Sequence, residues 1–495
     1  MTTNTPNTPN TPNTPNPQNN TETAKTNVGK IPQMAVINKI STPQLKKVHS
    51  GKVRESFAVD SGRRLIVATD RISAFDVVLN SLIPSKGAVL TSIASDWFEK
   101  TRHIVPNHIL SQPHPQAVVV RECAPIKVEM IVRGYITGSA WRGYEKGKRT
   151  FSGVSLPDGL KKNDKLPSPI VTPTTKEDSD REITPADIVS SGLASKALYE
   201  QMAKVSLELY QFGATELAKR GLILVDTKYE FGIFNNELML IDEIHTPDSS
   251  RMWTERSWKE NQISPVEFDK ETVRRWLLDN TKNGVMPLTL PTEIVQNTTQ
   301  CYQGIYEMIT GKTIRTQDLG SEGLARSLVR EGFIKPGYVA IAMGSKADVE
   351  HAQKIAKIIR ENGIPAGLRV VSAHKNGERI TDIATEYNES PEAGVCIAIA
   401  GLSNGLGGAL AANLNIPVIN CPPFSDKSDL VVNINSSLMM PSGVPAMTVT
   451  TPELAALAAL RCLNIRSVRD AADLKREEMK KKLLEDDLNI GEMSL

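Results

Sequence analysis

The sequence predicts two folded parts of different architecture, preceded by a low-complexity arm. Residues 1–30 repeat threonine, proline and asparagine and carry almost no apolar side chains, so we expect no packed structure there. Residues 31–312 alternate short apolar strands, tight turns and helical stretches. From Tyr338 onward, strands alternate with amphipathic helices, which is typical of an α/β domain with a parallel sheet.

Composition narrows the classes of function. The chain has 58 Lys and Arg against 56 Asp and Glu, a formal net charge of +2, so nothing draws it globally to nucleic acid or to an acidic membrane. Its five cysteines have no paired spacing, which argues for a reducing compartment and against a zinc site or a disulfide framework. The most apolar stretch, residues 395–419, is broken by asparagines and glycines, unlike a membrane span. We therefore expect a cytoplasmic protein that binds small molecules.

A β-hairpin is predicted between residues 225 and 244. Asp226, Lys228 and Glu230 share one face of its first arm, and Asp242 lies near the end of the apolar second arm. Mg²⁺ prefers a few carboxylate oxygens together with waters and substrate phosphates, so we predict that Glu230 and Asp242 bind Mg²⁺. A two-residue Asn-Asn loop would place the two carboxylates on opposite faces. We therefore predict a three-residue loop, or a bulge with the same effect, that pairs Glu230 with Asp242.

Four polar residues follow the hairpin within a short segment: Asp248, Ser249, Ser250 and Arg251. Short polar donors beside an arginine suit an anionic substrate. A turn closed by the aspartate and the serines, with a solvated arginine, fits the same residues equally well.

Two lysine–glycine turns precede the hairpin. Gly51 and Lys52 open one predicted strand, and Lys86 precedes Gly87 in the second turn. The backbone at a glycine can approach a phosphate closely, and the ammonium group supplies positive charge. The pattern differs from the P-loop and occurs by chance in many proteins, so either turn is only a candidate for binding nucleotide phosphates.

A further anion-binding candidate lies where an apolar strand ends at Arg133 and is followed by Ser139. The alternative is a surface arginine beside a turn. Residues 150–185, rich in Pro, Lys, Asp and Thr, are predicted to form a long loop that closes over a site. Residues 184–220 and 264–312 are predicted to be helical.

Seven stretches occur in order along the first half: GKVRESF, ATDRISAFDV, PSKG, VEMIVRGYITGSAW, TPTTKED, DTKYEFG and DEIHTPDSSRMW. Together they resemble the SAICAR synthetase family (phosphoribosylaminoimidazole-succinocarboxamide synthetase) of purine biosynthesis, over about residues 40–312. The resemblance implies a two-lobed α+β fold related to the ATP-grasp group. It also implies that ATP phosphorylates the carboxylate of carboxyaminoimidazole ribotide and that the amine of aspartate then displaces the phosphate. Such chemistry depends mainly on positioning and on neutralising charge.

The same resemblance implies roles for individual residues. ATP would lie at Gly51, Lys52 and Lys86, and Mg²⁺ at Glu230 and Asp242. Lys228 and Asp226 are the candidate catalytic residues of this half. The residues expected to bind the ribotide or aspartate, with their division between the two ligands left open, are Arg133, Ser139, Lys228, Asp248, Ser249 and Arg251.

Three predicted strands of the second half end in small polar residues, namely Ser345, then Ser372 with His374, then Ser403 with Asn404. Ligands of parallel sheets bind at the carboxyl ends of the strands. A lone histidine is more often structural than catalytic, but His374 stands at a strand exit beside Lys375, which favours a catalytic role.

The stretches MGSKAD, VVSAHK, AGLSNGLGG, CPPFSD and SSLMMPSGVP resemble the aminoimidazole ribotide (AIR) carboxylase family over about residues 338–466. This family has an α/β, flavodoxin-like fold and an octameric core, and it uses neither biotin nor a metal for this step. The SAHK form is similar to the subclass that uses CO₂ directly, whereas another subclass rearranges a carbamate. The resemblance makes His374 the residue that handles protons. The residues implied to hold ribose and phosphate are Ser345, Asp348, Ser372 and Lys375.

Three positions depart from the carboxylase pattern. Ala347 replaces a usual serine, and Leu402 and Met439 stand where arginine is frequent. A silent carboxylase module that serves as an oligomerisation scaffold is therefore the alternative to an active one, although the SAHK element favours activity. We expect the following divisions: an arm (1–30), the synthetase (31–312), a linker (313–336), the carboxylase (337–466) and a charged helical tail (467–495) whose role is open.

Overall fold

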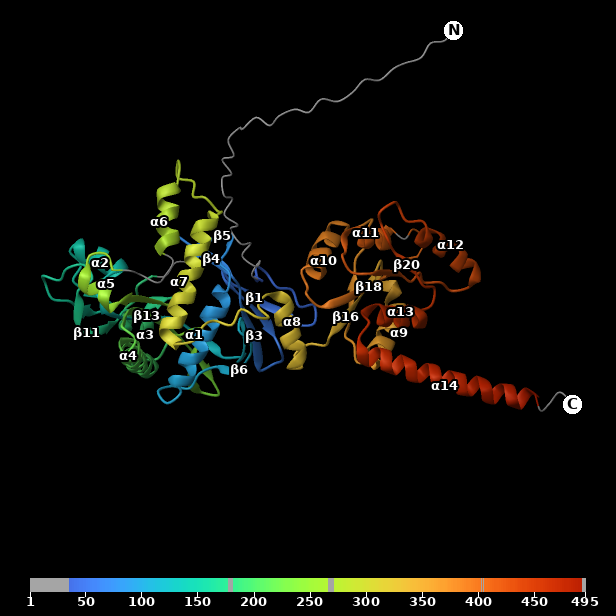
Figure 1. Ribbon diagram of the computed structural model, residues 1–495, viewed down its shortest axis with the longest axis horizontal. Helices are drawn as coiled ribbons and strands as arrows, with labels where there is room; N and C mark the ends of the chain where they lie inside the picture. The colour runs from blue at the N-terminus through green and yellow to red at the C-terminus, as the bar shows by residue number, and fades with distance from the viewer. Residues whose placement is uncertain (1–34, 177–180, 266–270, 402, 404, 492–495) are drawn as a thin grey trace, which may run out of the picture. The chain divides into compact units, whose positions relative to one another are not determined.

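The computed structural model describes residues 35–176, 181–265, 271–401, 403 and 405–491 (Figure 1). The low-complexity arm predicted at 1–30 lies outside these residues, as do two positions predicted to matter in the second half, Leu402 and Asn404.

The first sheet is antiparallel, with strand order β1-β2-β3-β7-β6. Its strands are β1 (Lys46–Ser50), β2 (Arg54–Ala58), β3 (Arg63–Ala68), β6 (Ile109–His114) and β7 (Ala117–Arg121). A short hairpin of β4 (Arg71–Ala74) and β5 (Val77–Leu82) follows β3. One face of the sheet buries Phe57 and Leu65 against Leu324 and Leu328 of α8 (Ser321–Arg330). Part of the predicted linker therefore belongs to the core of the first half.

The second sheet is also antiparallel, with order β11-β8-β13-β14, while β12 pairs with β8 and β15 with β13. Its strands are β8 (Ala124–Tyr135), β11 (Lys165–Val171), β12 (Thr174–Thr175), β13 (Leu222–Phe234), β14 (Glu237–Ile241) and β15 (Ser250–Thr254). The prediction of a long loop over 150–185 is wrong in part, because β11 and β12 lie there, together with the hairpin of β9 (Thr150–Phe151) and β10 (Val154–Ser155). The two prolines of β11 concealed the strand, but an edge strand tolerates proline.

Helices pack around the second sheet to complete the first half. They are α1 (Lys86–Lys100), α2 (Gly138–Glu145), α3 (Pro185–Ser190), α4 (Lys196–Ala218), α5 (Glu255–Glu260), α6 (Glu271–Asn280) and α7 (Thr292–Thr310). The helices predicted within 184–220 and 264–312 are thus confirmed. The backbone N–H of Asp187 donates to the Thr184 hydroxyl at 3.2 Å, as expected of a threonine N-cap. Tyr210 of α4 donates its hydroxyl to the carbonyl of Leu224 on β13 at 2.7 Å, which joins helix and sheet.

The hairpin of β13 and β14 has a register different from the predicted one. Asn235 and Asn236 have φ of 51° and 63°, so they form a two-residue turn that pairs Phe234 with Glu237 and Glu230 with Ile241. Two left-handed residues suit such a turn because its twist matches that of the strands. The predicted three-residue loop is therefore wrong. Asp242 itself leaves the strand with φ of 69°, and this left-handed conformation, instead of the register, directs its carboxylate.

The second half contains a fully parallel sheet, as predicted, with order β17-β16-β18-β19-β20. Its strands are β16 (Gly337–Met343), β17 (Ala366–Val370), β18 (Ala393–Ile399), β19 (Val418–Asn420) and β20 (Met447–Thr448). Its helices are α9 (Val349–Glu361), α10 (Glu378–Asn388), α11 (Gly405–Asn413), α12 (Lys427–Leu438), α13 (Pro452–Leu463) and α14 (Arg466–Gly491), preceded by the 3₁₀ turn η1 (Lys346–Asp348).

Helices cover both faces of the parallel sheet (Figure 1). Ile341 of β16, an inner strand of the sheet, packs in the same cluster as Ile355 of α9 and Leu460 of α13. Ala340, its neighbour on the other face, packs with residues of α10 and α11. The predicted charged tail forms α14. Over the residues that the structure describes, no helix has the length and apolarity needed to cross a membrane.

Candidate active sites

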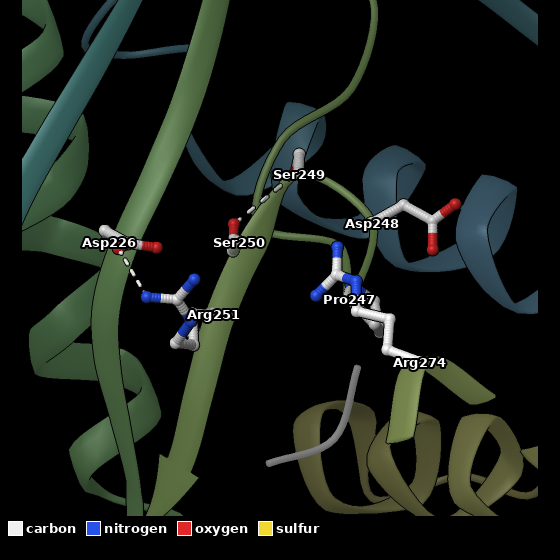
Figure 2. A pocket seen from close by; sticks show the side chains of 7 residues that line it. All are labelled: Asp226, Pro247, Asp248, Ser249, Ser250, Arg251 and Arg274. Atoms are coloured by element: carbon white, nitrogen blue, oxygen red, sulfur yellow. Dashed lines mark hydrogen bonds and ion pairs between the residues drawn. The ribbon is translucent and has the colours of Figure 1, made fainter. Parts of the chain in front are cut away.

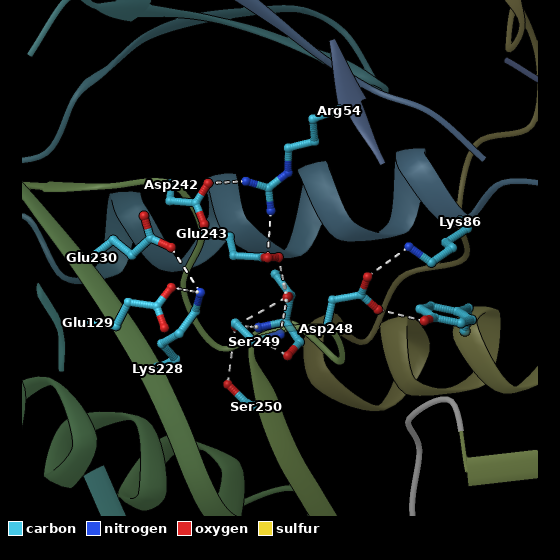
Figure 3. A network of polar contacts seen from close by, with 12 residues as sticks. Arg54, Lys86, Glu129, Lys228, Glu230, Asp242, Glu243, Asp248, Ser249 and Ser250 are labelled. Carbon is cyan, nitrogen blue, oxygen red and sulfur yellow. Dashed lines mark hydrogen bonds and ion pairs between the residues drawn. The ribbon is translucent and has the colours of Figure 1, made fainter. Parts of the chain in front are cut away.

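Buried charges gather where β13 and β8 run side by side (Figure 3). Glu230 and Glu129 are direct cross-strand neighbours, an arrangement of like charges that is destabilising unless a cation intervenes. Lys228 supplies the cation, with its Nζ 2.5 Å from Glu129 Oε1 and 2.9 Å from Glu230 Oε1. Lys176 also donates to Glu230. Burial works to lower the pKa of Lys228, but the two glutamates raise it above its ordinary value and keep the lysine charged.

Asp242 and Glu243 extend this cluster through Arg54, the first residue of β2 (Figure 3). The Arg54 guanidinium binds Asp242 through Nη1 and approaches Glu243 Oε1 to 2.6 Å through Nη2. Arg54 was not among the predicted site residues, although it stands only two residues after Lys52 at the start of a strand. Burial opposes the charge of Arg54, yet the nearby carboxylates, Asp242 foremost, raise its pKa above the ordinary value.

The two predicted metal ligands influence one another's titration. Burial and then the charge of Asp242 raise the pKa of Glu230. Burial also acts to raise the pKa of Asp242, but Arg54 and the lysines hold it below its usual value. Glu230 is buried, Asp242 is half-buried, and the negative charge of Asp242 raises the pKa of Glu230, so a divalent cation suits the pair. Across the described residues no cluster of three or more His, Cys, Asp or Glu side chains is arranged to hold a metal, so Mg²⁺ here would need waters and phosphates as further ligands.

A pocket of about 140 Å³ lies beside this cluster (Figure 2). Arg251 Nη1 and Arg133 Nη1 lie 3.2 Å and 3.5 Å from Asp226 Oδ2. Arg274 of α6 also lines the pocket, and the sequence analysis missed it because nothing in a helical pattern marks which arginine faces a strand. The full lining is Asp226, Pro247, Asp248, Ser249, Ser250, Arg251 and Arg274.

Ser139 lies near this pocket, at the start of α2. It is exposed, and an added Cβ at its neighbour Gly138 would lie 2.9 Å from Arg251 Nη1. Gly138 also has φ of 55°, so glycine both permits the turn and lets the Arg251 guanidinium approach the backbone.

The two lysines predicted to bind ATP lie in different environments. Lys52 is exposed in the turn between β1 and β2, with its Nζ 2.6 Å from Asp76 Oδ1. Arg71 donates to the carbonyl of Gly51 at 3.0 Å and so fixes this turn. Lys86 is fully buried and pairs with Asp248 at 2.8 Å.

Strand ends also meet in the second half, as predicted. Gly344 donates to Ile399 at 2.9 Å, so the segments after β16 and β18 lie together. An added Cβ at Gly405, the first residue of α11, would lie 2.9 Å from His374 Cε1, which places the imidazole beside that helix start. The exposed residues at this edge are Ser345, Ser403, His374 and Lys375, and Ser372 is half-buried.

Two of the residues that depart from the carboxylase pattern, Ala347 and Met439, are both exposed to solvent. Ala347 is exposed next to Ser345, whose hydroxyl accepts from its backbone N–H at 3.1 Å. Met439 is 83% exposed just after α12. Burial raises the pKa of Asp348, the last residue of η1.

The first half of the chain matches a family model described as SAICAR synthetase over residues 47–288. A phosphoribosylaminoimidazole-succinocarboxamide synthase of Flavobacterium psychrophilum is 44% identical over 289 residues, which cover 56% of this chain and 92% of that protein. The chain belongs to the SAICAR synthetase family. A second such synthase, from Cytophaga hutchinsonii, is 47% identical over 276 residues and covers 54% of this chain and 88% of that protein.

The second half matches a family model described as AIR carboxylase over residues 338–483. A solved SAICAR synthase from Saccharomyces cerevisiae, complexed with SAICAR, is 38% identical, covers 56% of this chain and 99% of that chain, and gives a TM-score of 0.52. The PurE structure from Treponema denticola is 36% identical over 31% of this chain and 98% of that chain, with a TM-score of 0.29. The two family models confirm both resemblances. The chain is an enzyme that joins a SAICAR synthetase to an AIR carboxylase domain in purine biosynthesis.

Within the synthetase, His245 lies in a buried aromatic environment behind the hairpin. Its Nε2 lies 2.6 Å from the Tyr229 hydroxyl, and its ring meets Trp97 edge-on with centroids 4.7 Å apart. An added Cβ at Gly213 of α4 would lie 2.3 Å from the His245 ring. Burial lowers the pKa of His245 to about 3, so the imidazole is neutral when the protein is folded at neutral pH.

Acid should therefore destabilise the synthetase through His245. Below pH 6.5 His245 is protonated in the unfolded chain but stays neutral in the folded protein, where its pKa is about 3. The stability that this residue contributes above pH 6.5 is therefore lost as the pH falls toward about 3. Replacing His245 with Gln should reduce the loss of unfolding free energy between pH 7 and pH 5 by about 2 kcal/mol. Denaturant titrations at each pH, followed by tryptophan fluorescence, measure this free energy of unfolding. The signal reports on the synthetase half because all five tryptophans lie there. The exposed His103→Gln is the control, and equal pH dependence in both variants would contradict the assignment.

Proposed function

We propose that Glu230 and Asp242 would hold Mg²⁺ in the SAICAR synthetase site, where ATP activates a ribotide carboxylate for attack by aspartate. The observation that carries this proposal is the set of ion pairs around the two carboxylates: Arg54 pairs with Asp242, and Lys176 and Lys228 pair with Glu230. When bound, Mg²⁺ would neutralise phosphate charge and orient the transferred group.

The proposed reaction has two steps, and residues of the chain hold the reactants for both. A carboxylate oxygen of the ribotide attacks the γ-phosphorus, and the bond to ADP breaks. The aspartate amine then attacks the carbonyl carbon, the bond to phosphate breaks, and the nitrogen loses a proton. We propose that Gly51, Lys52 and Arg54 hold the nucleotide phosphates, since they lie on one turn and the strand that follows it.

The arginines of the neighbouring pocket suit the substrates' anionic groups. We propose that Arg133, Arg251 and Arg274 bind carboxylate or phosphate, with Ser139 and Ser249 as donors beside them. Asp226 contacts two of these arginines, so we propose that it orients them. Lys228 binds both Glu129 and Glu230, so it is a fixed cation on β13 next to one of the two proposed metal ligands.

For the carboxylase domain we propose direct use of CO₂, without biotin, and a catalytic role for His374. The nucleophilic ring carbon of AIR attacks CO₂, a C–C bond forms, and the proton on that carbon leaves to a base. His374 and Lys375 are exposed a few residues after β17 ends, and the His374 ring lies beside Gly405 at the start of α11. This is the edge at which parallel sheets bind ligands.

The assembly and the divisions of the chain are also proposals. Large apolar side chains are exposed on α12 and just after it, including Val431, Val432 and Leu438. This supports an octamer built through the carboxylase domain. The burial of Leu324 and Leu328 supports ending the synthetase domain after α8 instead of at residue 312.

One coupled assay tests these functions. The full chain is given AIR and dissolved CO₂ without ATP, and carboxyaminoimidazole ribotide is measured; ATP, Mg²⁺ and aspartate are then added and SAICAR is measured. We expect carboxylation before ATP is added and one ADP released per SAICAR formed. Faster initial carboxylation with fresh CO₂ than with bicarbonate supports the CO₂ route, and equal initial rates overturn it. Absence of the first product together with SAICAR formation from added carboxyaminoimidazole ribotide would establish the silent scaffold.

A further inference from the structure

Lys86 occupies an unusual position for a residue expected to meet a soluble ligand. It is the first residue of α1, and its side chain is 0% exposed. Its Nζ lies 2.8 Å from Asp248 Oδ2, and the Asp248 side chain is only 7% exposed. A buried ion pair is costly to open, because either charge left alone loses both its partner and its water.

Asp248 is held from a second direction by α7. The Tyr302 hydroxyl donates to Asp248 Oδ1 at 2.6 Å, and Tyr302 is itself fully buried. The Lys86 ammonium lies 5.4 Å from the centroid of the Tyr302 ring, within range of a cation–π interaction. Lys86, Asp248 and Tyr302 therefore contact one another and join α1, α7 and the loop that precedes β15.

The backbone around Lys86 is fixed as well. The Gly87 N–H donates to Asp70 Oδ1 at 3.0 Å, and an added Cβ at Gly87 would lie 2.2 Å from the carbonyl oxygen of Ala68. Gln303 of α7 donates to the Ser85 hydroxyl at 3.0 Å. Lys86 thus projects from a rigid turn, so its contact with Asp248 is built into the fold.

The loop that Asp248 belongs to carries residues of both candidate subsites (Figure 3). Ser250 N donates to the carbonyl of Thr246 at 2.9 Å, and the Thr246 hydroxyl donates to Glu243, which pairs with Arg54. The segment from Asp242 to Arg251 comprises the loop between β14 and β15, residues 242–249, and the first two residues of β15. In Figure 2 the Asp248 carboxylate points away from Arg251, and it meets Lys86 on the other side.

We propose that Lys86, Asp248 and Tyr302 form a buried latch that positions the segment from Asp242 to Arg251, the loop together with the start of β15, for the synthetase reaction. In this assignment Lys86 is a positioning residue and acts through Asp248, in place of the phosphate contact expected from the sequence. The inference rests on the proposed synthetase mechanism, because the latched loop carries one carboxylate of the proposed metal site and one arginine of the proposed substrate clamp.

The latch and the phosphate contact predict opposite effects of removing both charges. A latch needs matched partners, so a neutral pair of similar shape keeps the loop in place. A phosphate ligand needs the positive charge of Lys86 whatever stands at position 248. The full chain is therefore compared with Lys86→Met, Asp248→Asn and the double variant, in steady-state assays that vary ATP and aspartate separately.

We expect each single change to lower kcat by about tenfold or more while the KM for ATP changes less than about threefold, and the double variant to recover most of the loss. A KM for ATP that rises about tenfold in Lys86→Met and stays raised in the double variant would overturn the latch. Lys259→Met with Glu255→Gln is the matched control, because that exposed pair has a comparable separation of 2.6 Å. Wild-type SAICAR formation, measured alongside, tests the synthetase function separately.

Tyr302→Phe covers the case in which a single charge change prevents folding. It removes one hydroxyl and keeps the ring, so the protein should still fold, with a melting temperature lowered by a few degrees because buried Asp248 loses one hydrogen bond. We expect kcat to fall several-fold with the KM for ATP unaltered. An unchanged kcat in the folded Tyr302→Phe variant would contradict the role of the latch in positioning the loop.

Discussion

Replacing Asp242 with asparagine is expected to lower ATP-dependent formation of SAICAR by about 100- to 1,000-fold. Asparagine keeps the shape of the side chain and removes its charge, so the site loses half of the anionic pair that attracts a divalent cation. The left-handed backbone at this position, with φ of 69°, is compatible with asparagine, so the loop should keep its conformation. Steady-state rates with saturating substrates measure the effect.

Binding of Mn²⁺ distinguishes loss of the metal from loss of the fold. In the presence of ADP, electron paramagnetic resonance should show tightly bound Mn²⁺ in the wild-type chain and much weaker binding in Asp242→Asn. Asp158→Asn is the matched control, because Asp158 lies at the surface with its side chain 88% exposed. Carboxylation by the second domain should continue in both variants. Full synthetase activity in Asp242→Asn would refute a metal-binding role.

The fold was predictable where local pattern and tertiary packing agree. The alternation of strands with amphipathic helices from Tyr338 onward predicted a parallel sheet, and the sheet is parallel. The β13–β14 hairpin was likewise evident from its alternation. The register was not evident, because the prediction relied on strand pairing to align Glu230 with Asp242. No residue near Asp242 indicates the left-handed backbone conformation that directs its carboxylate instead.

The residues of the candidate site were likewise predictable only where they are close in the sequence. Lys228, Glu230 and Asp242 belong to one hairpin or directly follow it, so the local pattern predicted them together. Arg54 and Tyr302 come from distant elements and reach the site only through packing. The burial of Lys86 was equally invisible, since a lysine–glycine turn looks the same whether the lysine faces solvent or an aspartate of another segment. Tertiary contacts therefore decide between a ligand-binding and a positioning role.

Replacing His374 with glutamine is expected to lower carboxylation of AIR by about 100- to 10,000-fold, while SAICAR formation from supplied carboxyaminoimidazole ribotide continues at the wild-type rate. Glutamine can form hydrogen bonds but cannot accept the proton that must leave the ring carbon. His374 lies beside Gly405 at the edge where strand ends meet, so a small amide side chain fits without displacing α11. Release of ring-bound tritium, together with product formation, measures proton removal directly.

The outcome of this substitution also decides between the two views of the second domain. Ala347 and the exposed Met439 remove a hydroxyl and a cation that the carboxylase pattern usually supplies, whereas His374 and Lys375 are present at the strand exit. If His374 is the base, wild type carboxylates AIR, the exposed His103→Gln control matches it, and His374→Gln does not. Equal carboxylation by wild type and His374→Gln would assign proton transfer to another group. If neither protein yields product, the carboxylase domain is catalytically silent. It would then serve only as an oligomerisation scaffold, through the apolar surface on α12.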